Sequence, residues 1–439
     1  MVSYVPSTLK EQKEMLESIG LSSIDELFAH IPDELKLKGE LNIPSGKSEM
    51  EVSRTMKDIA SHSHIFGTIF RGAGAYSHYI PSIVKSVVSK EEFVTAYTPY
   101  QAEISQGILQ SIFEYQTMIC ELTGMDVSNA SVYDGATAAA EAVNMCCERS
   151  RQVVFCSEAA HPDTISVIKT YCWAAGHELV LVPHKDGKTD WDSIASQLDK
   201  KTSACVYVQS PNFFGQLEEV EKAAELIHSV GGKLICGCNP IALGALKTPA
   251  EQGADIAVGE GQPLGMSLSF GGPYLGFMAA TSAMMRKLPG RIVGETTDVD
   301  GKRAFVLTLQ AREQHIRREK ASSNICSNQA LCAMTASVYL AAMGPEGLRR
   351  AALMCYQNAH TLAEKLCSIP GIQLKYTGTF FHEFVTKQTD SDRILSALEK
   401  EGILGGYPLE NGNILWCATE KNTTEEIDKV VNIIRKELM

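Results

Sequence analysis

Six short apolar runs that alternate with helical stretches constrain the fold of this chain most. The runs are Val153–Cys156, Leu179–Val182, Ala204–Gln209, Lys233–Cys238, Asp255–Val258 and Leu275–Ala279. Helical patterns such as Leu217–Val230 separate several of them. Because parallel strands are joined by long and usually helical crossovers, the alternation predicts βαβ units and a mostly parallel sheet covered by helices on both faces. Ligands of such sheets bind beyond the carboxyl ends of the strands.

The chain on either side of this region predicts two smaller parts. Residues 7–60 are charged and helical in pattern, with breaks at Gly20 and Pro32, and resemble an arm rather than a core. After a long helical region near 323–368, short strand runs alternate with amphipathic helices. We therefore expect a helical arm over 1–64, a large α/β domain over 65–335 and a small α+β domain over 336–439.

One helix is specified in detail by its own residues. From Ser105 onward, apolar side chains such as Ile112, Ile119 and Leu122 fall on one face at helical spacing. Gly124 stands where a helix of this length needs its C-cap. The pattern predicts a helix that ends at Gly124.

Composition limits the partners of the chain. The 40 Lys and Arg residues are outnumbered by 52 Asp and Glu, so the formal net charge of −12 argues against a general affinity for nucleic acid or an anionic membrane. No apolar run reaches the ~18 residues of a membrane span. The 13 cysteines are scattered, and pairs such as Cys146–Cys147 lack the spacing of zinc sites. We expect no metal, and a cytoplasmic protein without a signal peptide.

The stretch VYDGATAAAEAV, residues 132–143, places Asp-Gly-Ala-Thr before an alanine-rich helical run. Gly135, Ala136 and Thr137 would present backbone N–H groups at the start of a helix, where anions bind. The same residues also suit simple capping of that helix by Asp134 or Thr137. Both interpretations stay open at this point.

Basic residues gather in LQAREQHIRREKASSNIC, residues 309–326. In an acidic chain, a local patch with Arg312, His315 and Arg318 suits a carboxylate, a phosphate or an acidic partner, but it also suits a solvated helical face. His161 follows a predicted strand end. Its imidazole would either stack on a flat cofactor or belong to an ordinary loop before Pro162.

Taken together, the arm, the large α/β domain with its early anion site and the small α+β domain resemble a fold-type I pyridoxal-phosphate enzyme. Four long segments make the resemblance closer. They are 23–34 (SIDELFAHIPDE), 96–142 (beginning AYTPYQAEISQG), 260–277 (EGQPLGMSLSFGGPYLGF) and 288–326 (beginning LPGRIVGETTDVDG). They resemble the glycine cleavage system P-protein family, in particular the amino-terminal half of that protein, which in many bacteria is a separate subunit.

The resemblance implies pyridoxal-phosphate-dependent decarboxylation of glycine, with the aminomethyl group passed to the lipoyl arm of the H-protein. This chemistry requires a lysine that holds the cofactor and a carboxylate that keeps its pyridine nitrogen protonated. By the resemblance, the carboxylate belongs at the strand end Gly237–Asn239, where no acidic residue stands. The lysine belongs in the turn Gly259–Gly265, where Gln262 and its neighbours stand instead.

Two independent absences imply a chain that holds no pyridoxal phosphate covalently and completes the active site of a catalytic partner subunit in an α2β2 assembly. The cofactor would lie in that partner, and the early anion site at Gly135–Thr137 would be vestigial. Residues at the start of the helix near 105 and in the preceding loop are the candidates for contact with the partner's site. They are Tyr97, Thr98, Tyr100, Gln101 and Glu103, together with Tyr76 and His78.

The basic patch gains a role in this context. Arg312, His315 and Arg318 would hold the glycine carboxylate or steer the H-protein. Two alternatives of other kinds stay open. One is a self-sufficient homodimer that uses an unconventional lysine such as Lys247 for the cofactor. The other is a scaffolding or regulatory paralogue that binds the carrier protein without supporting catalysis.

Overall fold

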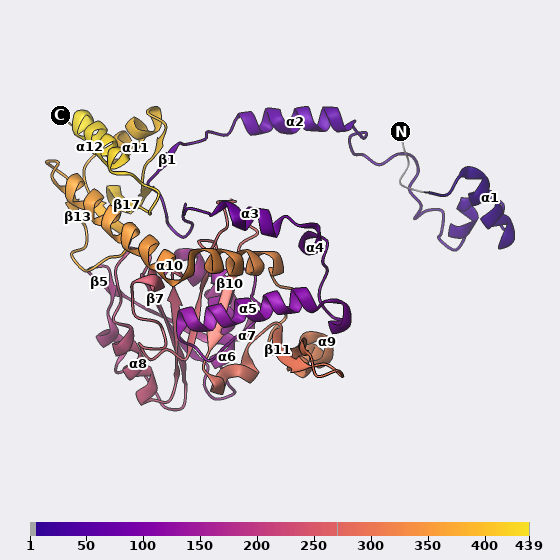
Figure 1. Ribbon diagram of the computed structural model, residues 1–439, viewed down its shortest axis with the longest axis horizontal. Helices are drawn as coiled ribbons and strands as arrows, with labels where there is room; N and C mark the ends of the chain where they lie inside the picture. Colours follow the sequence, from indigo (N-terminus) through magenta and orange to yellow (C-terminus); the bar gives the residue numbers. More distant parts are fainter. Residues whose placement is uncertain (1–5, 270, 439) are drawn as a thin grey trace. The chain divides into compact units, whose positions relative to one another are not determined.

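The computed structural model describes residues 6–269 and 271–438. The chain divides into two compact units, residues 1–65 and 66–439 (Figure 1). The first unit contains α1 (Leu9–Ser18), the 3-10 helix η1 (Ile24–Phe28) and α2 (Glu49–Ser61). Both α-helices begin with capping boxes, formed by Thr8 with Glu11 and by Ser48 with Glu51. None of the described residues of these three helices is buried.

A seven-stranded sheet forms the centre of the second unit, with the strand order β2-β10-β9-β8-β7-β3-β4. Its strands are β2 (Val127–Ser128), β3 (Val153–Ser157), β4 (Glu178–Val182), β7 (Ser203–Ser210), β8 (Lys233–Cys238), β9 (Ile256–Glu260) and β10 (Gly276–Ala280). The strands from β4 to β9 in this order pair in parallel, whereas β10 is antiparallel to both of its neighbours. The predicted mostly parallel α/β sheet is confirmed.

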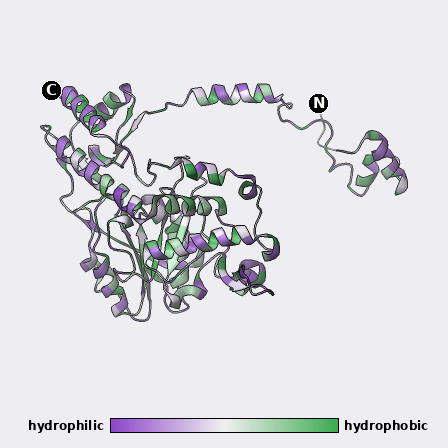
Figure 2. Cartoon of the chain, viewed as in Figure 1, coloured by the Kyte–Doolittle hydropathy of each residue, from purple (hydrophilic) through white to green (hydrophobic). Residues whose placement is uncertain are grey.

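Helices cover both faces of this sheet. The helices are α5 (Gln106–Thr123), α6 (Gly135–Cys146), α7 (Pro162–Ala175), α8 (Val220–Ser229) and α10 (Ala330–Cys367). One core joins α5, α8 and α10 to one set of strand side chains, such as Val206 and Val208. A second core joins α6 and α7 to the alternate set, such as Cys205 and Tyr207. Figure 2 shows hydrophobic colouring in these central strands.

The predicted helix after Ser105 is α5, and it ends where its pattern indicated. Gly124 is the C-cap of α5, with φ of 74° in the left-handed region. A hairpin that the sequence did not predict, β11 (Ile292–Thr297) with β12 (Arg303–Thr308), packs against this helix. The basic segment that follows forms only short pieces, and not one helical face. They are η6 (Gln310–Arg312), α9 (Gln314–Arg317) and η7 (Arg318–Lys320).

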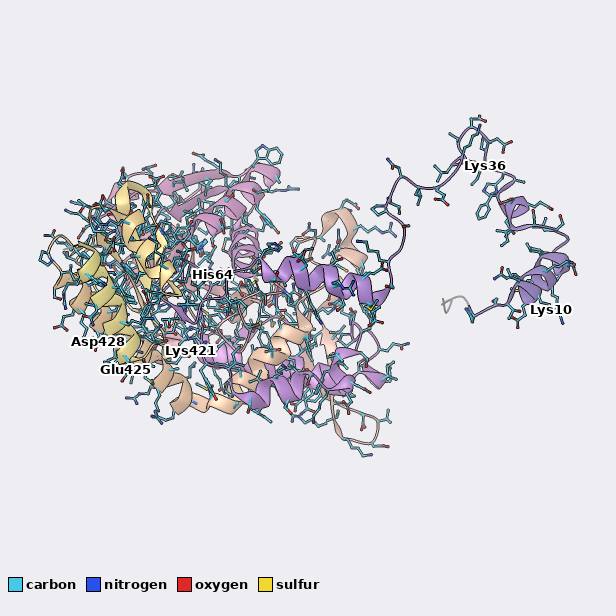
Figure 3. All side chains as sticks on the ribbon, turned by 90° about the horizontal axis from the view of Figure 1, so that it is seen from above. Lys10, Lys36, His64, Lys421, Glu425 and Asp428 are labelled. Atoms are coloured by element: carbon cyan, nitrogen blue, oxygen red, sulfur yellow. The ribbon has the colours of Figure 1, made fainter. Side chains whose placement is uncertain are left out.

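A four-stranded antiparallel sheet with its own core lies towards the C-terminus. It contains β13 (Gln373–Leu374), β14 (Glu383–Lys387), β16 (Tyr407–Pro408) and β17 (Asn413–Cys417), and it is accompanied by α11 (Ser391–Lys400) and α12 (Thr424–Leu438). Its core includes Phe384 and Trp416. On α12, Glu425 and Asp428, both marked in Figure 3, are exposed, while Ile427 is buried. This alternation fits the amphipathic helix expected for the end of the chain.

The remaining elements are short. They are β1 (Thr68–Ile69), α3 (Ser82–Val88), α4 (Glu91–Val94), η2 (Ala102–Ile104), β5 (His184–Lys185), β6 (Lys188–Thr189), η3 (Trp191–Ile194), η4 (Ala242–Gly244), η5 (Ser282–Lys287), β15 (Ile403–Leu404) and η8 (Glu410–Gly412). Strand β1 pairs in parallel with β15, so the start of the second unit is tied to its last hundred residues. Among the described residues, no helix is long and apolar enough to cross a membrane.

Candidate functional site

A cavity of about 710 Å³ lies at the carboxyl ends of the central strands, where the fold class predicts a ligand site. The ends of β7, β8 and β9, the first turn of α6, the loop Arg71–Tyr76 and the start of β14 line it. No lysine stands among the described residues of its wall. Gly237–Asn239 and Gly259–Glu260, two of the places at which the family resemblance sets cofactor chemistry, line this cavity, whereas Gln262 lies just behind them in the turn that follows β9.

Gln262 occupies the position of the expected lysine and is buried, with 1% of its surface exposed. Its amide oxygen accepts a hydrogen bond from the backbone nitrogen of Tyr76 at 2.9 Å. Its amide nitrogen donates to the carbonyl oxygens of Tyr76 at 3.0 Å and Met266 at 2.7 Å. The side chain is thus fully engaged with the backbone of this chain.

The strand end that should carry the carboxylate has no room for one. A Cβ atom at Gly237 would lie 2.4 Å from the hydroxyl oxygen of Tyr207. Asn239, two residues further, accepts hydrogen bonds from the backbone nitrogens of Ile241 at 2.9 Å and Ala242 at 3.2 Å. The Tyr207 hydroxyl thus occupies the space beside Gly237, and the side chain of Asn239 is used to hold the turn that follows the strand.

The first turn of α6 is satisfied by two carboxylates of this chain. Asp134 caps the helix by accepting a hydrogen bond from the backbone nitrogen of Thr137 at 2.7 Å. Glu260 accepts one from Gly135 at 3.0 Å, and its other oxygen accepts from the backbone nitrogens of Gln262 and Leu275. Burial of this carboxylate raises the pKa of Glu260 to about 7. Of the two interpretations of this turn, the structure shows capping.

The loop Gly72–Tyr76 lies along the cavity wall and is held by His161 and Glu383. Glu383 accepts hydrogen bonds from the backbone nitrogen of Ala73 and from the Tyr76 hydroxyl, both at 2.7 Å. Burial raises the pKa of Glu383 to about 7. His161 caps α7 by accepting from the backbone nitrogen of Asp163 through Nδ1, so its Nε2–H donates to the carbonyl oxygen of Ala73 at 3.0 Å. The imidazole is therefore committed to the loop.

The residues present do not fit pyridoxal phosphate as a covalently held group. Gln262 cannot form the bond that a lysine forms, and Gly237 offers no charge to a pyridine nitrogen. The N–H groups at the helix end that would receive the phosphate are already bonded to Asp134 and Glu260. Three separate requirements for the cofactor fail in this part of the fold.

The structure places the candidate residues near 100 on the surface of the second unit. The ring of Tyr97 is 84% exposed, and that of Tyr100 is 55% exposed. Gln101 and Glu103 are also exposed, while Thr98 is half-buried. The Tyr100 hydroxyl accepts a hydrogen bond from Arg291, whose guanidinium lies 5.2 Å from the Tyr100 ring and is buried. This segment is open to a partner.

The two candidates in the preceding loop lie inside the chain. His78 is buried and forms an ion pair with Glu420 through Nδ1 at 2.7 Å. The thiol of Cys355 donates to the same carboxylate oxygen at 3.2 Å. Tyr76 is half-buried, with its hydroxyl on Glu383. The structure thus separates these residues from the exposed segment with which the sequence grouped them.

The basic patch is also divided. Arg312 is half-buried and donates to the carbonyl oxygens of Leu288 and Gly290, so its guanidinium braces that turn. His315 is exposed and lies 3.6 Å from the carboxylate of Glu313. Arg318 is exposed, with φ of 54°. Of the three predicted residues, His315 and Arg318 are open to an external anion.

Sequence reasoning missed Glu260, Glu383 and Arg291. A signal existed for Glu260, because a carboxylate that directly follows a predicted buried strand stands at the sheet edge where ligands bind. No local pattern marks Glu383 or Arg291. Their partners Ala73 and Tyr100 are 310 and 191 residues away in the chain.

The fold is that of the pyridoxal-phosphate-dependent transferases. The structure superposes on sphingosine-1-phosphate lyase of Burkholderia pseudomallei with a TM-score of 0.65 over 93% of this chain and 94% of the other, at 13% identity, which establishes the fold alone. A crystal structure of glycine decarboxylase (P-protein) of the glycine cleavage system, in inhibitor-bound form, matches much better. It has a TM-score of 0.93 and 41% identity over 99% of this chain and 100% of that one.

Sequence relatives agree with the structural match. Residues 2–434 match the family described as glycine cleavage system P-protein. The chain is 52% identical to a protein of Carboxydothermus hydrogenoformans and 49% identical to one of Moorella thermoacetica, over 99% of both chains in each case. Both are described as "Probable glycine dehydrogenase (decarboxylating) subunit 1". The chain belongs to the glycine cleavage system P-protein family and is of the subunit 1 type.

Proposed function

We propose that this chain is the subunit of the P-protein that lacks the cofactor lysine. Together with a partner subunit that carries pyridoxal phosphate, it decarboxylates glycine and passes the aminomethyl group to the lipoyl arm of the H-protein. The cofactor, held in the partner, supplies the electron sink for that chemistry. The observation that carries the proposal is the burial of Gln262, bonded to the Tyr76 backbone, at the position of the lysine.

A partner subunit is supported by two further features. The relatives are named as subunit 1 of glycine dehydrogenase, a name that implies at least one other subunit. The described residues of α1, η1 and α2 include exposed apolar side chains such as Leu9, Met50 and Met56. Apolar helix faces of this kind are stabilised when a second surface covers them. We propose an α2β2 assembly.

The exposed segment near residue 100 is the contribution of this chain to the partner's site. Tyr97 and Tyr100 present large aromatic surfaces, and such residues are enriched at interfaces. Glu103, exposed in η2, is available for proton transfer or for hydrogen bonding. His315 and Arg318 are the basic residues available to steer an acidic H-protein, whereas Arg312 serves the turn Leu288–Gly290.

The proposal is tested by mixing the purified chain with its lysine-bearing partner and lipoylated H-protein and by measuring glycine–bicarbonate exchange. We expect activity from the mixture and none from this chain alone. Borohydride reduction followed by peptide mapping should label a lysine in the partner only. A labelled lysine in this chain, such as Lys247, would establish a self-sufficient enzyme. If the mixture is no more active than the partner alone, the chain is a scaffold or a regulator.

A further inference from the structure

The backbone of the loop between Phe70 and Pro81 is held in its conformation by hydrogen bonds with side chains. All of its residues are described, and they form no helix or strand. Backbone N–H and C=O groups that lack a ladder need other partners when they are buried. In this loop the partners include carboxylates, an imidazole, a hydroxyl and one amide, all contributed by residues far away in the chain.

The amide is that of Gln262, which bonds to both backbone polar groups of Tyr76, as a residue of a paired β-strand would. It accepts the N–H of Tyr76 at 2.9 Å and donates to the C=O of the same residue at 3.0 Å. Both polar groups of one loop residue are therefore satisfied by one buried side chain. Its third bond, to the carbonyl oxygen of Met266 at 2.7 Å, fixes the amide to its own turn.

Two carboxylates hold the loop on either side of this point. Before it, Glu383 binds the backbone nitrogen of Ala73 at 2.7 Å. After it, Glu420 binds the imidazole of His78 at 2.7 Å and the backbone nitrogen of Tyr79 at 2.6 Å. The loop also fits closely, since a Cβ atom at Gly74 would lie 2.6 Å from Nε2 of His161. The amide of Gln262 lies between these two anchors, and the Thr419 hydroxyl adds a further bond, to the carbonyl oxygen of Ser77 at 2.8 Å.

The anchored loop leads directly to exposed apolar surface. The Tyr79 side chain is 59% exposed, and that of Ile83, in the first turn of α3, is 50% exposed. Val84, the next residue of α3, is buried in the core that α5, α8 and α10 form with the sheet. The position of Tyr79 and α3 on the surface therefore depends on where the loop is held.

We infer that Gln262 is a positioning residue for the reaction: by holding the Tyr76 backbone it keeps in place the loop that leads to the exposed Tyr79 and α3, a surface that this chain offers to the partner in addition to the segment near residue 100. The inference rests on the proposed function. By this inference, the residue at the position expected for the lysine holds the loop in place instead of binding a cofactor. An amide offers both an acceptor and a donor at its tip, whereas a charged lysine could not accept the Tyr76 N–H and an ionised glutamate could not donate to its C=O.

The test uses the assembled wild-type complex and complexes with Q262M, which has similar volume and no hydrogen bond to Tyr76. Q252M is the matched control, because Gln252 also donates its amide to backbone oxygens, at Lys247 and Thr248, but in a turn away from the cavity. Hydrogen exchange at the Tyr76 amide reports the anchor. Size-exclusion chromatography reports assembly, and kcat and KM for glycine report the reaction.

We expect Q262M to assemble, to exchange the Tyr76 amide about tenfold faster or more, and to lose about tenfold in kcat with little change in KM, as loss of buried hydrogen bonds worth ~1 kcal/mol each would produce. Q252M should match the wild type. Should Q262M fail to assemble, Q262E and Q262K replace it, since each keeps part of the bonding, and intermediate losses in kcat are then expected.

Two results would overturn the inference while leaving the proposed function intact. One is an active wild-type complex with unchanged Tyr76 exchange in Q262M, which would remove the anchor. The other is faster exchange with wild-type kcat in the assembled variants, which would show that the anchor does not serve the reaction. An inactive wild-type complex would instead overturn the proposed function, and the inference with it.

Discussion

The carboxylate of Glu260 lies 3.0 Å from the backbone nitrogen of Gly135, in the first turn of α6. The N-terminus of a helix carries a partial positive charge and attracts an anion. Here a carboxyl group from the end of β9 in the same chain takes that place, and Asp134 adds a second one at Thr137. A phosphate would have to displace a carboxylate that is bonded to three backbone N–H groups.

Restoring a lysine should therefore not restore cofactor binding. We expect Q262K, alone or with G237D, to show no absorbance of a Schiff base with added pyridoxal phosphate and no borohydride-labelled lysine. Any side chain added at Gly237 would collide with the Tyr207 hydroxyl, and the helix end stays occupied. A lysine in place of Gly265 fares worse, because that residue has φ of 92° and its Cβ atom would lie 2.9 Å from Cβ of Tyr339.

The partner subunit, treated identically, is the positive control for this measurement. A glycine-reactive absorbance in Q262K would show that the lysine alone was missing. It would contradict the view that the cavity lost several requirements together.

The stability of the chain should fall between pH 4.5 and 7 because of Glu383. Burial raises the pKa of Glu383 from 4.5 to about 7, so the folded state holds the proton more tightly than the unfolded state. Its contribution is complete below pH 4.5 and is lost as the pH rises through 7, with a magnitude on the order of 3 kcal/mol. Urea unfolding across this range measures the slope.

The variant E383Q should reduce that slope without abolishing it, because burial also raises the pKa values of Glu260, Glu218 and Glu141. The control E295Q alters an exposed ion pair with Arg303 and should leave the slope unchanged. An identical pH profile in E383Q and the wild type would mean that Glu383 is ionised throughout.

The ion pair of His78 with Glu420 should be strongly coupled. Burial opposes ionisation of Glu420, but the hydrogen bond and charge of His78 lower its pKa to about 2. This stabilisation is present above pH 4.5 and is lost as the pH falls through about 2. A double-mutant cycle of H78A and E420A, measured by urea unfolding at pH 7, should give a coupling of about 1–3 kcal/mol.

The exposed pair Glu295–Arg303 provides the comparison, with an expected coupling below about 1 kcal/mol. Equal couplings for the two pairs would show that burial adds nothing to the interaction of His78 with Glu420. This experiment measures unfolding and not activity, so it can be done on the isolated chain.

Substitution of Tyr97 should affect the complex and not the chain. Because its ring is 84% exposed, Y97A should change the free energy of unfolding of the isolated chain by less than about 0.5 kcal/mol. An interface tyrosine is worth about 1–2 kcal/mol, so the affinity for the partner should fall about tenfold, as measured by calorimetry. W173A, at a residue 82% exposed on α7, is the control expected to bind normally.

A loss of affinity that is equal in Y97A and W173A would point to a general surface effect. No loss in Y97A would place the interface elsewhere and would weaken the proposed role of the segment near residue 100.

Periodicity in the sequence predicted the elements whose residues face one core. The run Lys233–Cys238 is β8 without change, and Gly124 ends α5 because only glycine takes the left-handed backbone there at little cost. The hairpin β11–β12 was not predicted because its strands are partly exposed and mix polar with apolar side chains. Short-range patterns are informative where one face is buried and much less so elsewhere.

The sequence predicts which residues are missing from the candidate site better than it predicts which contacts form there. Missing residues can be read at a single position, as at Gln262 and Gly237. The contacts of Gln262 with Tyr76 span 186 residues, and the bond of His78 with Glu420 spans 342. Because tertiary structure alone brings such pairs together, the sequence indicates Tyr76 and His78 as contacts for a partner's site, while the structure pairs them with Glu383 and Glu420 inside the chain.

The cavity of about 710 Å³ at the strand ends is lined by Glu260 and Glu383, which are bonded within the chain, and by His382, whose ring nitrogens lack a hydrogen-bond partner. A hollow at this edge is a general feature of parallel α/β sheets, so its presence alone does not indicate a ligand. A screen for small-molecule inhibitors of this protein that is guided by concavity would select this hollow. Under the proposed role of the segment near residue 100, such compounds should be aimed at the exposed aromatic surface around Tyr97 instead.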